Sequence, residues 1–186
     1  MGQFPTGVSV KFNPALTLIH LLANQPEIRT RPVIMLCIGS DRYTGDSLGP
    51  LVGSYLEEIG GFNIYGSLEQ PIHAGNLEET IKCIEQRYFN PVIIAVDACL
   101  GKEHEIGNIE IWEGSLEAGI AVGNRLPSIG TISIVGVVNR GGQVGYLELQ
   151  TTPLSIVVKL SKIIGQVLSK ATAGFFSKHS DHSVTS

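Results

Sequence analysis

Hydrophobic residues in this chain fall into short continuous runs that alternate with longer amphipathic segments. Continuous apolar runs cover residues 33–38 and 92–96, and residues 62–66 are expected to form a short further strand. Runs that are apolar on both faces are typical of parallel strands buried in the centre of a sheet. Between them, residues 48–59 and 76–88 carry apolar positions at helical spacing. The alternation predicts an α/β fold: a three-layer, doubly wound, mostly parallel sheet with helices on both faces.

The rest of the chain adds elements on both sides of this alternating region. Asn13 and Pro14 predict a helix start, and the helix itself is expected over residues 15–22. Residues 113–127 are expected to form a long loop, whereas residues 141–150 fit either a strand or an irregular connection. Two further strands and a final helix are predicted over residues 109–112, 131–138 and 154–168.

Two of the predicted helices begin with residues that are suited to capping. Ser47 precedes the helix at residues 48–59. Asn76 and Glu79 form a capping-box pattern at the start of the next helix. Such side chains accept hydrogen bonds from free backbone N–H groups of the first turn, so we expect both helices to be capped in this way.

Length and composition fit one compact domain. The chain has 186 residues, of which 43% are hydrophobic and 16% are charged, and a chain of this length can bury a core without disulfides. We expect a single α/β domain over residues 1–176, in which residues 1–31 supply a leading helix and a candidate propeptide. Residues 177–186 are polar and are expected to form a flexible tail.

Charge and cysteine content narrow the classes of partner. The formal net charge is −4 and there is no long basic run, so a nucleic-acid partner is not expected. The three cysteines show no CxxC spacing, which favours a reducing compartment. The chain shows no signal-peptide pattern and no apolar run long enough to span a membrane. We therefore expect a cytoplasmic protein with no membrane partner and no obligatory cofactor.

Two aspartates follow predicted strands and carry the chemistry. Asp46 lies in the polar segment after the strand at 33–38, and Asp97 directly follows the strand at 92–96. Open α/β sheets bind ligands beyond the carboxyl ends of their strands, and a flavodoxin-like order, 2-1-3, would make these two strands neighbours. The two carboxylates would then share one site, where their pKa values can split into a base and an acid. The sequence does not decide which aspartate is the base.

Each aspartate also has a purely structural interpretation. Asp46 lies where the N–H groups of a helix start favour a carboxylate, and Asp97 is suited to an Asx-turn at the end of a strand. Gly45 and Gly49 flank Asp46, and such small residues would let a substrate backbone approach closely. A phosphate-binding loop is disfavoured, because the spacing from Gly39 to Gly45 is wrong and the next residue is acidic.

Three further residues near these positions are candidates for supporting roles. His73 follows the second strand and would reach the same edge of the sheet as a proton carrier or a ligand, although a lone loop histidine is more often a surface residue. Asp41 and Arg42 are adjacent and are expected to pair with each other. Cys99 is interpreted as a small buried thiol and not as a nucleophile, because no base is fixed beside it.

Long motifs in the chain resemble the YyaC-type sporulation proteases of endospore-forming bacteria. The resemblance covers roughly residues 30–165 and is most specific in the first motif. The motifs are CIGSDRYTGDSLGPLVG (residues 37–53), PIHAGNLEET (71–80), VDACLG (96–101) and GIAVGNRLPSIGTISIVGVVN (119–139). That family is similar to the spore germination protease and to hydrogenase maturation proteases, which implies a phosphorylase/hydrolase-type α/β fold.

The resemblance also implies roles for individual residues. Asp46 matches the first acidic residue of these proteases and Asp97 matches the second. The segment that contains Asn124 and Arg125 resembles a glycine-rich loop near the active site of the germination protease. The 71–80 motif contains His73 and Asn76. Hydrogenase maturation proteases use a glutamate and a later histidine that this chain lacks, so nickel recognition is not implied unless His73 substitutes.

The leading hypothesis is a peptidase in which Asp46 and Asp97 activate water against a peptide bond. Asp41, Arg42, His73, Asn76, Asn124 and Arg125 would support this site. The alternative is a non-catalytic protein that keeps the protease fold and binds a peptide or a divalent metal, with Asp46, Asp97 and His73 as metal ligands. The expected partner is a protein or peptide substrate, with spore proteins as candidates, and a homo-oligomer is compatible with the exposed loops.

Overall fold

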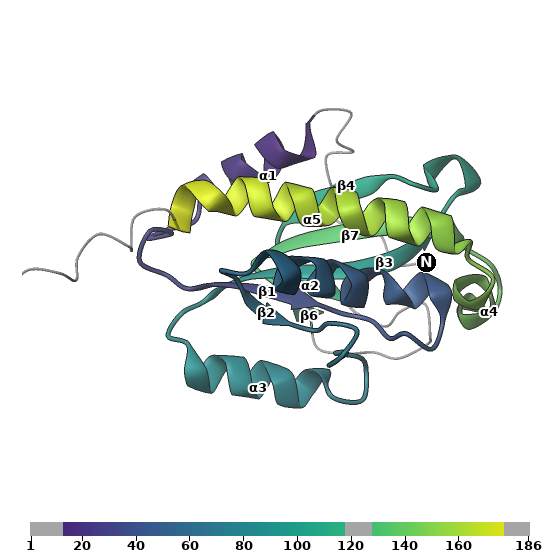
Figure 1. The fold of residues 1–186 in the computed structure, drawn as a ribbon, viewed down its shortest axis with the longest axis horizontal. Helices are drawn as coiled ribbons and strands as arrows, with labels where there is room; N and C mark the ends of the chain where they lie inside the picture. The colour runs from purple at the N-terminus through teal and green to yellow at the C-terminus, as the bar shows by residue number, and fades with distance from the viewer. Residues whose placement is uncertain (1–12, 118–127, 177–186) are drawn as a thin grey trace, which may run out of the picture.

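The computed structural model describes residues 13–117 and 128–176, and its central feature is a five-stranded sheet (Figure 1). The strands lie in the order β2-β1-β3-β7-β4. The first four are parallel to one another, while β4 pairs antiparallel with β7. Their bounds are β1 (Val33–Cys37), β2 (Asn63–Tyr65), β3 (Val92–Gly101), β4 (Ile109–Glu113) and β7 (Ile132–Arg140). The predicted α/β fold and the predicted 2-1-3 order of the first three strands are confirmed.

Helices cover both faces of the sheet, as the apolar pattern predicted. One face is covered by α1 (Pro14–Ala23), α2 (Leu48–Ile59) and α5 (Leu154–Phe176). The other face is covered by α3 (Leu77–Arg87) and by a short antiparallel pair, β5 (Leu116–Glu117) and β6 (Ser128–Ile129). Figure 1 shows α5 running beside α2, with α3 apart from both of them. The sheet is therefore the middle of three layers.

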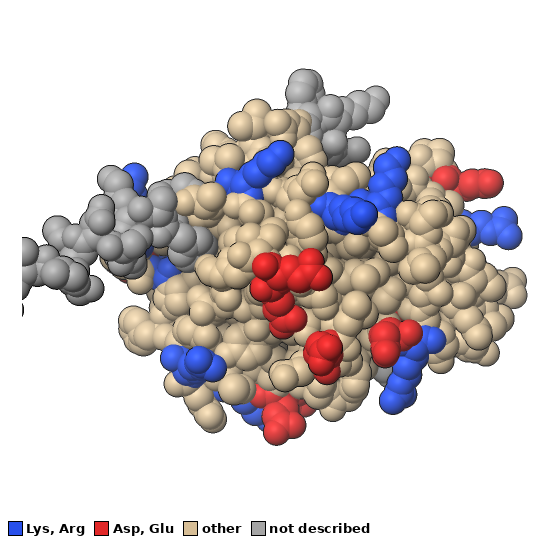
Figure 2. Space-filling model, viewed as in Figure 1, with Lys and Arg blue, Asp and Glu red and all other residues tan. Residues whose placement is uncertain are grey.

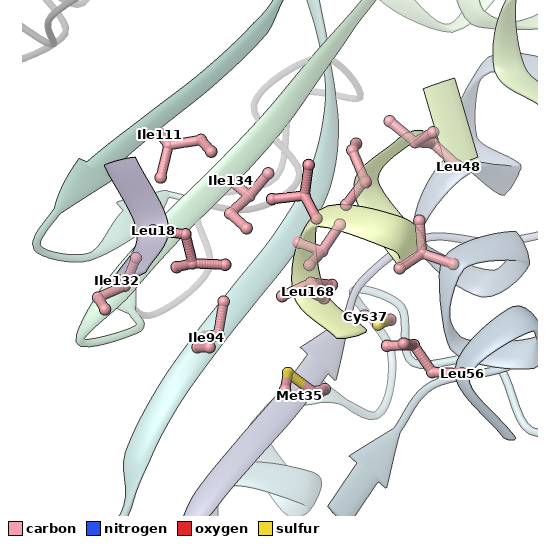
Figure 3. Packing of buried hydrophobic residues seen from close by; sticks show 14 of the residues in the cluster. Leu18, Met35, Cys37, Leu48, Leu56, Ile94, Ile111, Ile132, Ile134 and Leu168 are labelled. Atoms are coloured by element: carbon pink, nitrogen blue, oxygen red, sulfur yellow. The ribbon is translucent and has the colours of Figure 1, made fainter. Parts of the chain in front are cut away.

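The central strands are buried on both faces because their side chains alternate between two apolar clusters. In β1, Val33, Met35 and Cys37 belong to the cluster under α1, α2 and α5. Ile34 and Leu36 belong to the cluster under α3. Figure 3 shows the first cluster from close by, with side chains of β1, β3 and β7 directed toward those of the helices. This explains why the strand sequence is apolar without interruption.

The leading helix is part of the first cluster. The Asn13 side chain accepts a hydrogen bond from the N–H of Ala15 at 3.1 Å, which confirms the predicted helix start. Leu18 and Leu22 are fully buried against α5 and the sheet. Removal of residues 1–31 as a propeptide, which stays a prediction, would take both leucines away and expose the apolar side chains against which they pack.

Four predicted segments were wrong in type or extent. β3 does not end before Asp97 but continues to Gly101, because β7 runs beside it and supplies hydrogen-bonding partners along that whole length. The final helix likewise extends well past residue 168, to Phe176. Residues 141–150 contain a helix, α4 (Gly145–Gln150), which is too short to show helical periodicity. The predicted loop at 113–127 begins instead with β5, and residues 118–127 lie outside the described part of the chain.

Ser47 and Asn76 stand at the starts of α2 and α3 as predicted, but neither side chain makes the predicted capping hydrogen bond. A short 3₁₀ segment, η1 (Thr44–Ser47), precedes α2, and the Ser47 hydroxyl donates to the carbonyl oxygen of Thr44 at 2.7 Å. Ser47 therefore makes no capping hydrogen bond to α2. Asn76 likewise makes no side-chain cap on α3, because its side chain bonds to the preceding loop. In both cases a nearby loop group competes with the helix for the polar side chain.

The surface view in Figure 2 shows acidic and basic side chains scattered over one face, without a broad patch of either sign. Within residues 13–117 and 128–176, no helix is both long and apolar enough to cross a lipid bilayer.

Candidate functional site

The segment after β1 folds back on itself and places Asp46 beside the end of that strand. Gly39 has a φ of +143°, a conformation that residues with a Cβ rarely adopt. The N–H of Gly39 donates to the carbonyl of Ile72 at 2.7 Å, and the N–H of Ser40 donates to the carbonyl of Asp46 at 3.1 Å. The segment is thus tied to the loop after β2 and closed on itself, which fixes Asp46 in η1.

The glycines around Asp46 serve packing within the chain and not the approach of a substrate. A Cβ on Gly39 would overlap the carbonyl oxygen of Asp46, and a Cβ on Gly49 would overlap the backbone of Ile38. A Cβ on Gly45 would contact the side chains of Thr152 and of Leu149, which is in α4. The prediction that Gly45 and Gly49 admit a substrate backbone was therefore wrong, because other parts of the chain already occupy that space.

Asp97 lies within β3, at the point where the neighbouring strand β1 has ended. Cys37, the last residue of β1, is opposite Val96, and the N–H of Ile38 donates to the carbonyl of Val96 at 2.7 Å. The carboxyl of Asp97 accepts a hydrogen bond from the N–H of Ala98 at 2.7 Å. Asp97 is only 8% exposed, and by strand alternation its side chain is on the sheet face covered by α3.

The two aspartates are close enough to influence each other's ionisation. Burial raises the pKa of the Asp46 carboxyl from 3.8 to about 6, against the opposing effects of the Ser40 N–H and of His73. Burial raises the pKa of Asp97 well above 3.8, and the negative charge of Asp46 raises it further, while the Ala98 N–H opposes the shift. The two carboxyls are therefore coupled, and each has a pKa above its ordinary value.

This pair lies at the topological switch point of the sheet, between β1 and β3. From there the chain connects β1 to β2 on one side, while β3 and β7 extend the sheet on the other side. The predicted meeting of the two acids at one edge agrees with this arrangement. The strand-end interpretation of Asp97 as a turn residue does not, since β3 continues through it. Capping of α2 by Asp46 is not observed either, because Asp46 lies in the 3₁₀ segment before that helix.

His73 is held in one orientation by its own loop. Its Nδ1 accepts a hydrogen bond from the N–H of Gly75 at 3.0 Å. The Asn76 side chain accepts from the N–H of His73 at 2.8 Å and donates to the carbonyl of Pro71 at 3.0 Å. Because an N–H points at Nδ1, a neutral His73 carries its proton on Nε2. Asn76 is thus a positioning residue for the His73 loop.

The remaining predicted residues are not all brought to the site. Asp41 and Arg42 are exposed and do not form the expected ion pair. Asn124 and Arg125 fall outside the described residues. Burial raises the pKa of the Cys99 thiol to about 12, with Glu110, Asp97 and Glu105 adding to the shift, which agrees with its interpretation as an unreactive thiol.

Two features near Asp46 were missed from the sequence. Ser40 is 7% exposed, and its hydroxyl accepts a hydrogen bond from the N–H of Arg42 at 3.2 Å. The α4 segment packs against η1, and the rings of Tyr43 and Tyr146 lie 6.5 Å apart between their centroids. A polar residue after a buried strand is a weak signal for Ser40, but nothing in the local sequence indicates the contact of α4.

The metal-bound version of the site has limited structural support. Among residues 13–117 and 128–176, no group of three or more histidine, cysteine, aspartate and glutamate side chains is arranged to hold a metal ion. A metal on Nε2 of His73 would also require the ring proton on Nδ1, where the Gly75 N–H already points. Asp46, Asp97 and His73 as metal ligands stay a prediction.

Comparison with known proteins assigns the chain to a family. A family model described as "Protein of unknown function (DUF1256)" matches residues 10–167. The chain belongs to the DUF1256 family. It is 42% identical over 141 residues to "Uncharacterized protein YyaC" of Bacillus subtilis (strain 168), a match that covers 75% of this chain and 69% of that protein. The predicted relation to YyaC-type proteins is confirmed.

Solved structures with a similar arrangement include two archaeal proteins. One is the [NiFe] hydrogenase maturation protease HycI from Thermococcus kodakarensis KOD1, with a TM-score of 0.48 and 18% identity, covering 82% of this chain and 99% of that one. The other is the [NiFe] hydrogenase maturation protease HybD from Thermococcus kodakarensis, with a TM-score of 0.41 and 18% identity, covering 73% and 98%. Likenesses at this level carry no conclusion about the chemistry of this DUF1256 member.

Proposed function

We propose that this DUF1256 protein is a peptidase in which Asp46 acts as the general base and Asp97 as the general acid. The observation that carries the proposal is the placement of a buried carboxyl, Asp97, and a half-buried one, Asp46, at the switch point of the sheet, within electrostatic reach of each other. Their environments give the two carboxyls different pKa values, since Asp97 is more buried and the negative charge of Asp46 raises its pKa further. Paired acids with separated pKa values are suited to acid–base catalysis.

The reaction is a hydrolysis that needs one proton accepted and one proton donated. The ionised Asp46 carboxylate takes a proton from water, and the resulting hydroxide attacks the carbonyl carbon of the peptide bond. The protonated Asp97 carboxyl donates its proton to the amide nitrogen as the carbon–nitrogen bond breaks. The products are a carboxylic acid and an amine, and transfer of the proton from Asp46 to Asp97 restores the starting state of the pair. The Nε2–H of His73 is available to donate to the carbonyl oxygen, where negative charge develops.

The pH dependence of this mechanism follows from the order of ionisation. Activity should rise with pH as Asp46 ionises near 6, and it should fall again at higher pH as Asp97 loses its proton. Carboxyl carbon NMR titration checks the order without any substrate. A titration in which Asp97 ionises before Asp46 would contradict the assignment of roles.

The catalytic test replaces each aspartate with asparagine. Purified small acid-soluble spore proteins are the first substrates, because the sequence motifs resemble those of sporulation proteases. We expect Asp46→Asn and Asp97→Asn each to lower cleavage by about 100-fold or more, measured by mass spectrometry of the products. Glu85→Gln, an exposed carboxylate on α3, is the matched control. Full activity in either asparagine variant would remove that aspartate from the mechanism.

A further inference from the structure

A cavity of about 360 Å³ lies along β2, at one edge of the sheet, and neither aspartate of the proposed catalytic pair lines it. Its floor is the strand itself together with the residues on either side of it. One wall includes Glu57 of α2, and another is formed by Arg87 and Tyr88 at the end of α3. Because α2 and α3 cover opposite faces of the sheet, the cavity is a groove that straddles the sheet edge.

The main chain of β2 is open on the side that faces this groove. Asn63, Ile64 and Tyr65 are paired with β1 on one side, and in the described part of the chain no backbone hydrogen bond reaches their other side. At the opposite edge of the sheet, β4 packs against α1, and the side chain of its Glu113 accepts a hydrogen bond from the Gln25 side chain at 2.9 Å. An open edge of this kind presents free N–H and C=O groups to another strand.

The side chains around the groove also have unused polar groups. The hydroxyl of Tyr65 is buried and has no hydrogen-bond partner in the described structure. The guanidinium of Arg87 lies over the ring of Tyr88, 5.5 Å from its centroid, and within residues 13–117 and 128–176 no carboxylate pairs with it. Burial and the adjacent Tyr88 raise the pKa of the Tyr65 hydroxyl, and the positive charge of Arg87 acts in the opposite direction. Together they match a carboxylate on a bound chain.

We infer that β2 binds an extended peptide segment, which adds to the sheet as a further strand and places an acidic side chain against Arg87 and Tyr65. Main-chain hydrogen bonds would supply affinity, and the groove would select the side chains that enter it. The inference rests on the proposed function for its occupant, because a peptidase must hold its substrate as an extended chain beside the catalytic acids.

The groove adjoins the proposed catalytic site at one end. Gln70 and Ile72 line it, and the next residue along the chain is His73. Ile72 forms a parallel bridge with Ile38, the residue that follows β1. A peptide lying on β2 therefore extends toward the loop that carries His73. It also extends toward Asp46, because Asp46 follows β1, the strand next to β2 in the sheet.

The first test measures binding without cleavage. The probe is a fluorescein-labelled decapeptide of alternating valine and threonine with a central glutamate, and the protein is the Asp46→Asn variant. A second probe has the same side chains but N-methyl groups on alternate amides, which block strand pairing. We expect anisotropy titration to show at least ten-fold weaker binding of the methylated probe. Equal affinities for the two probes, or no binding of the first probe at about 1 mM, would overturn the inference.

The second test localises the binding. Tyr65→Phe and Arg87→Gln should each weaken binding about 3- to 10-fold, whereas Lys82→Gln, an exposed position on the same helix as Arg87, should leave it unchanged. Amide hydrogen exchange of residues 63–65 should slow when the peptide is bound. Equal losses in Lys82→Gln, or unchanged exchange in β2, would refute the location. Slowed exchange that appears without peptide as protein concentration rises would instead identify a second copy as the occupant.

The two proposals fail in different ways. Binding that survives in the groove while both asparagine variants keep full catalytic activity would reject the aspartate mechanism alone. The opposite outcome would reject the groove alone. In that case cleavage would depend on both aspartates, Tyr65→Phe and Arg87→Gln would have no effect, and bound peptide would not slow amide exchange in β2.

Discussion

The loop after β1 and the middle of β3 each carry one aspartate of the pair, and the two acids are held in place by different means. Asp97 is fixed by sheet pairing, since it lies opposite Val135 of β7 in a ladder that continues to Gly101. Asp46 is fixed by close backbone contacts that require glycine at Gly39 and Gly49. One acid is therefore placed by regular geometry, and the other by contacts that tolerate no added atom.

The largest effect is expected from Gly39→Ala. The added methyl group would overlap the carbonyl of Asp46, and the φ of +143° disfavours any residue with a Cβ. We expect a loss of about 3 kcal/mol or more in the free energy of unfolding, measured by urea denaturation. Gly61→Ala is the matched control, because Gly61 also has a positive φ but open space around it, and its cost should be about 1 kcal/mol. Equal losses would show that the loop is not tightly packed.

The second prediction concerns the stability cost of the buried carboxyls. A raised pKa in the folded state means that the unfolded chain ionises first, so stability falls as pH rises above 3.8. For Asp46 the loss accumulates up to pH about 6, and for Asp97 it continues to higher pH. Asp46→Asn should therefore be more stable than the parent protein at pH 8, by about 1–3 kcal/mol.

Asp97→Asn should gain more stability at pH 8 than Asp46→Asn, since Asp97 is the more buried of the two. Both gains should vanish near pH 3, where each carboxyl is protonated in the folded and unfolded states alike. Urea denaturation across this pH range is the measurement. A gain that is independent of pH would mean that ionisation is not its cause.

The third prediction separates the loop of His73 from both aspartates. Asn76→Ala removes two hydrogen bonds, to the N–H of His73 and to the carbonyl of Pro71. We expect a loss of about 1–2 kcal/mol in stability, together with faster amide exchange at residue 73. Asn108→Ala, outside this loop, is a suitable comparison for the effect of truncating an asparagine. Unchanged exchange at His73 would contradict the positioning role.

The smallest effect is expected from His73→Gln. His73 lowers the pKa of Asp46, so its removal should raise that pKa. The acid limb of any activity profile should move to higher pH by the same amount. Carboxyl NMR titration of Asp46 gives the answer directly, with His104→Gln as a control on an exposed segment. A shift in the opposite direction would rule out the electrostatic contact.

The sequence located most of the fold but misjudged where several elements end. The apolar run at residues 33–38 was sufficient to predict β1, because a strand buried on both faces has no polar positions. The end of β3 was missed, since Asp97 and the residues after it look like a loop until β7 is known to lie beside them. The caps at Ser47 and Asn76 failed for a related reason, because loop groups that compete for these side chains are not visible in the local sequence.

By itself, the sequence determined the alternation of strands and helices and the position of Asp46 and Asp97 along it, because burial imposes a regular period on the chain. The tertiary structure decided the ionisation of the two acids and the role of the glycines beside them. It also decided that β2 lies beside a groove at one edge of the sheet while β4, at the other edge, packs against α1. These properties depend on which distant segments come into contact, and burial and charge at a residue are set by all its neighbours in space.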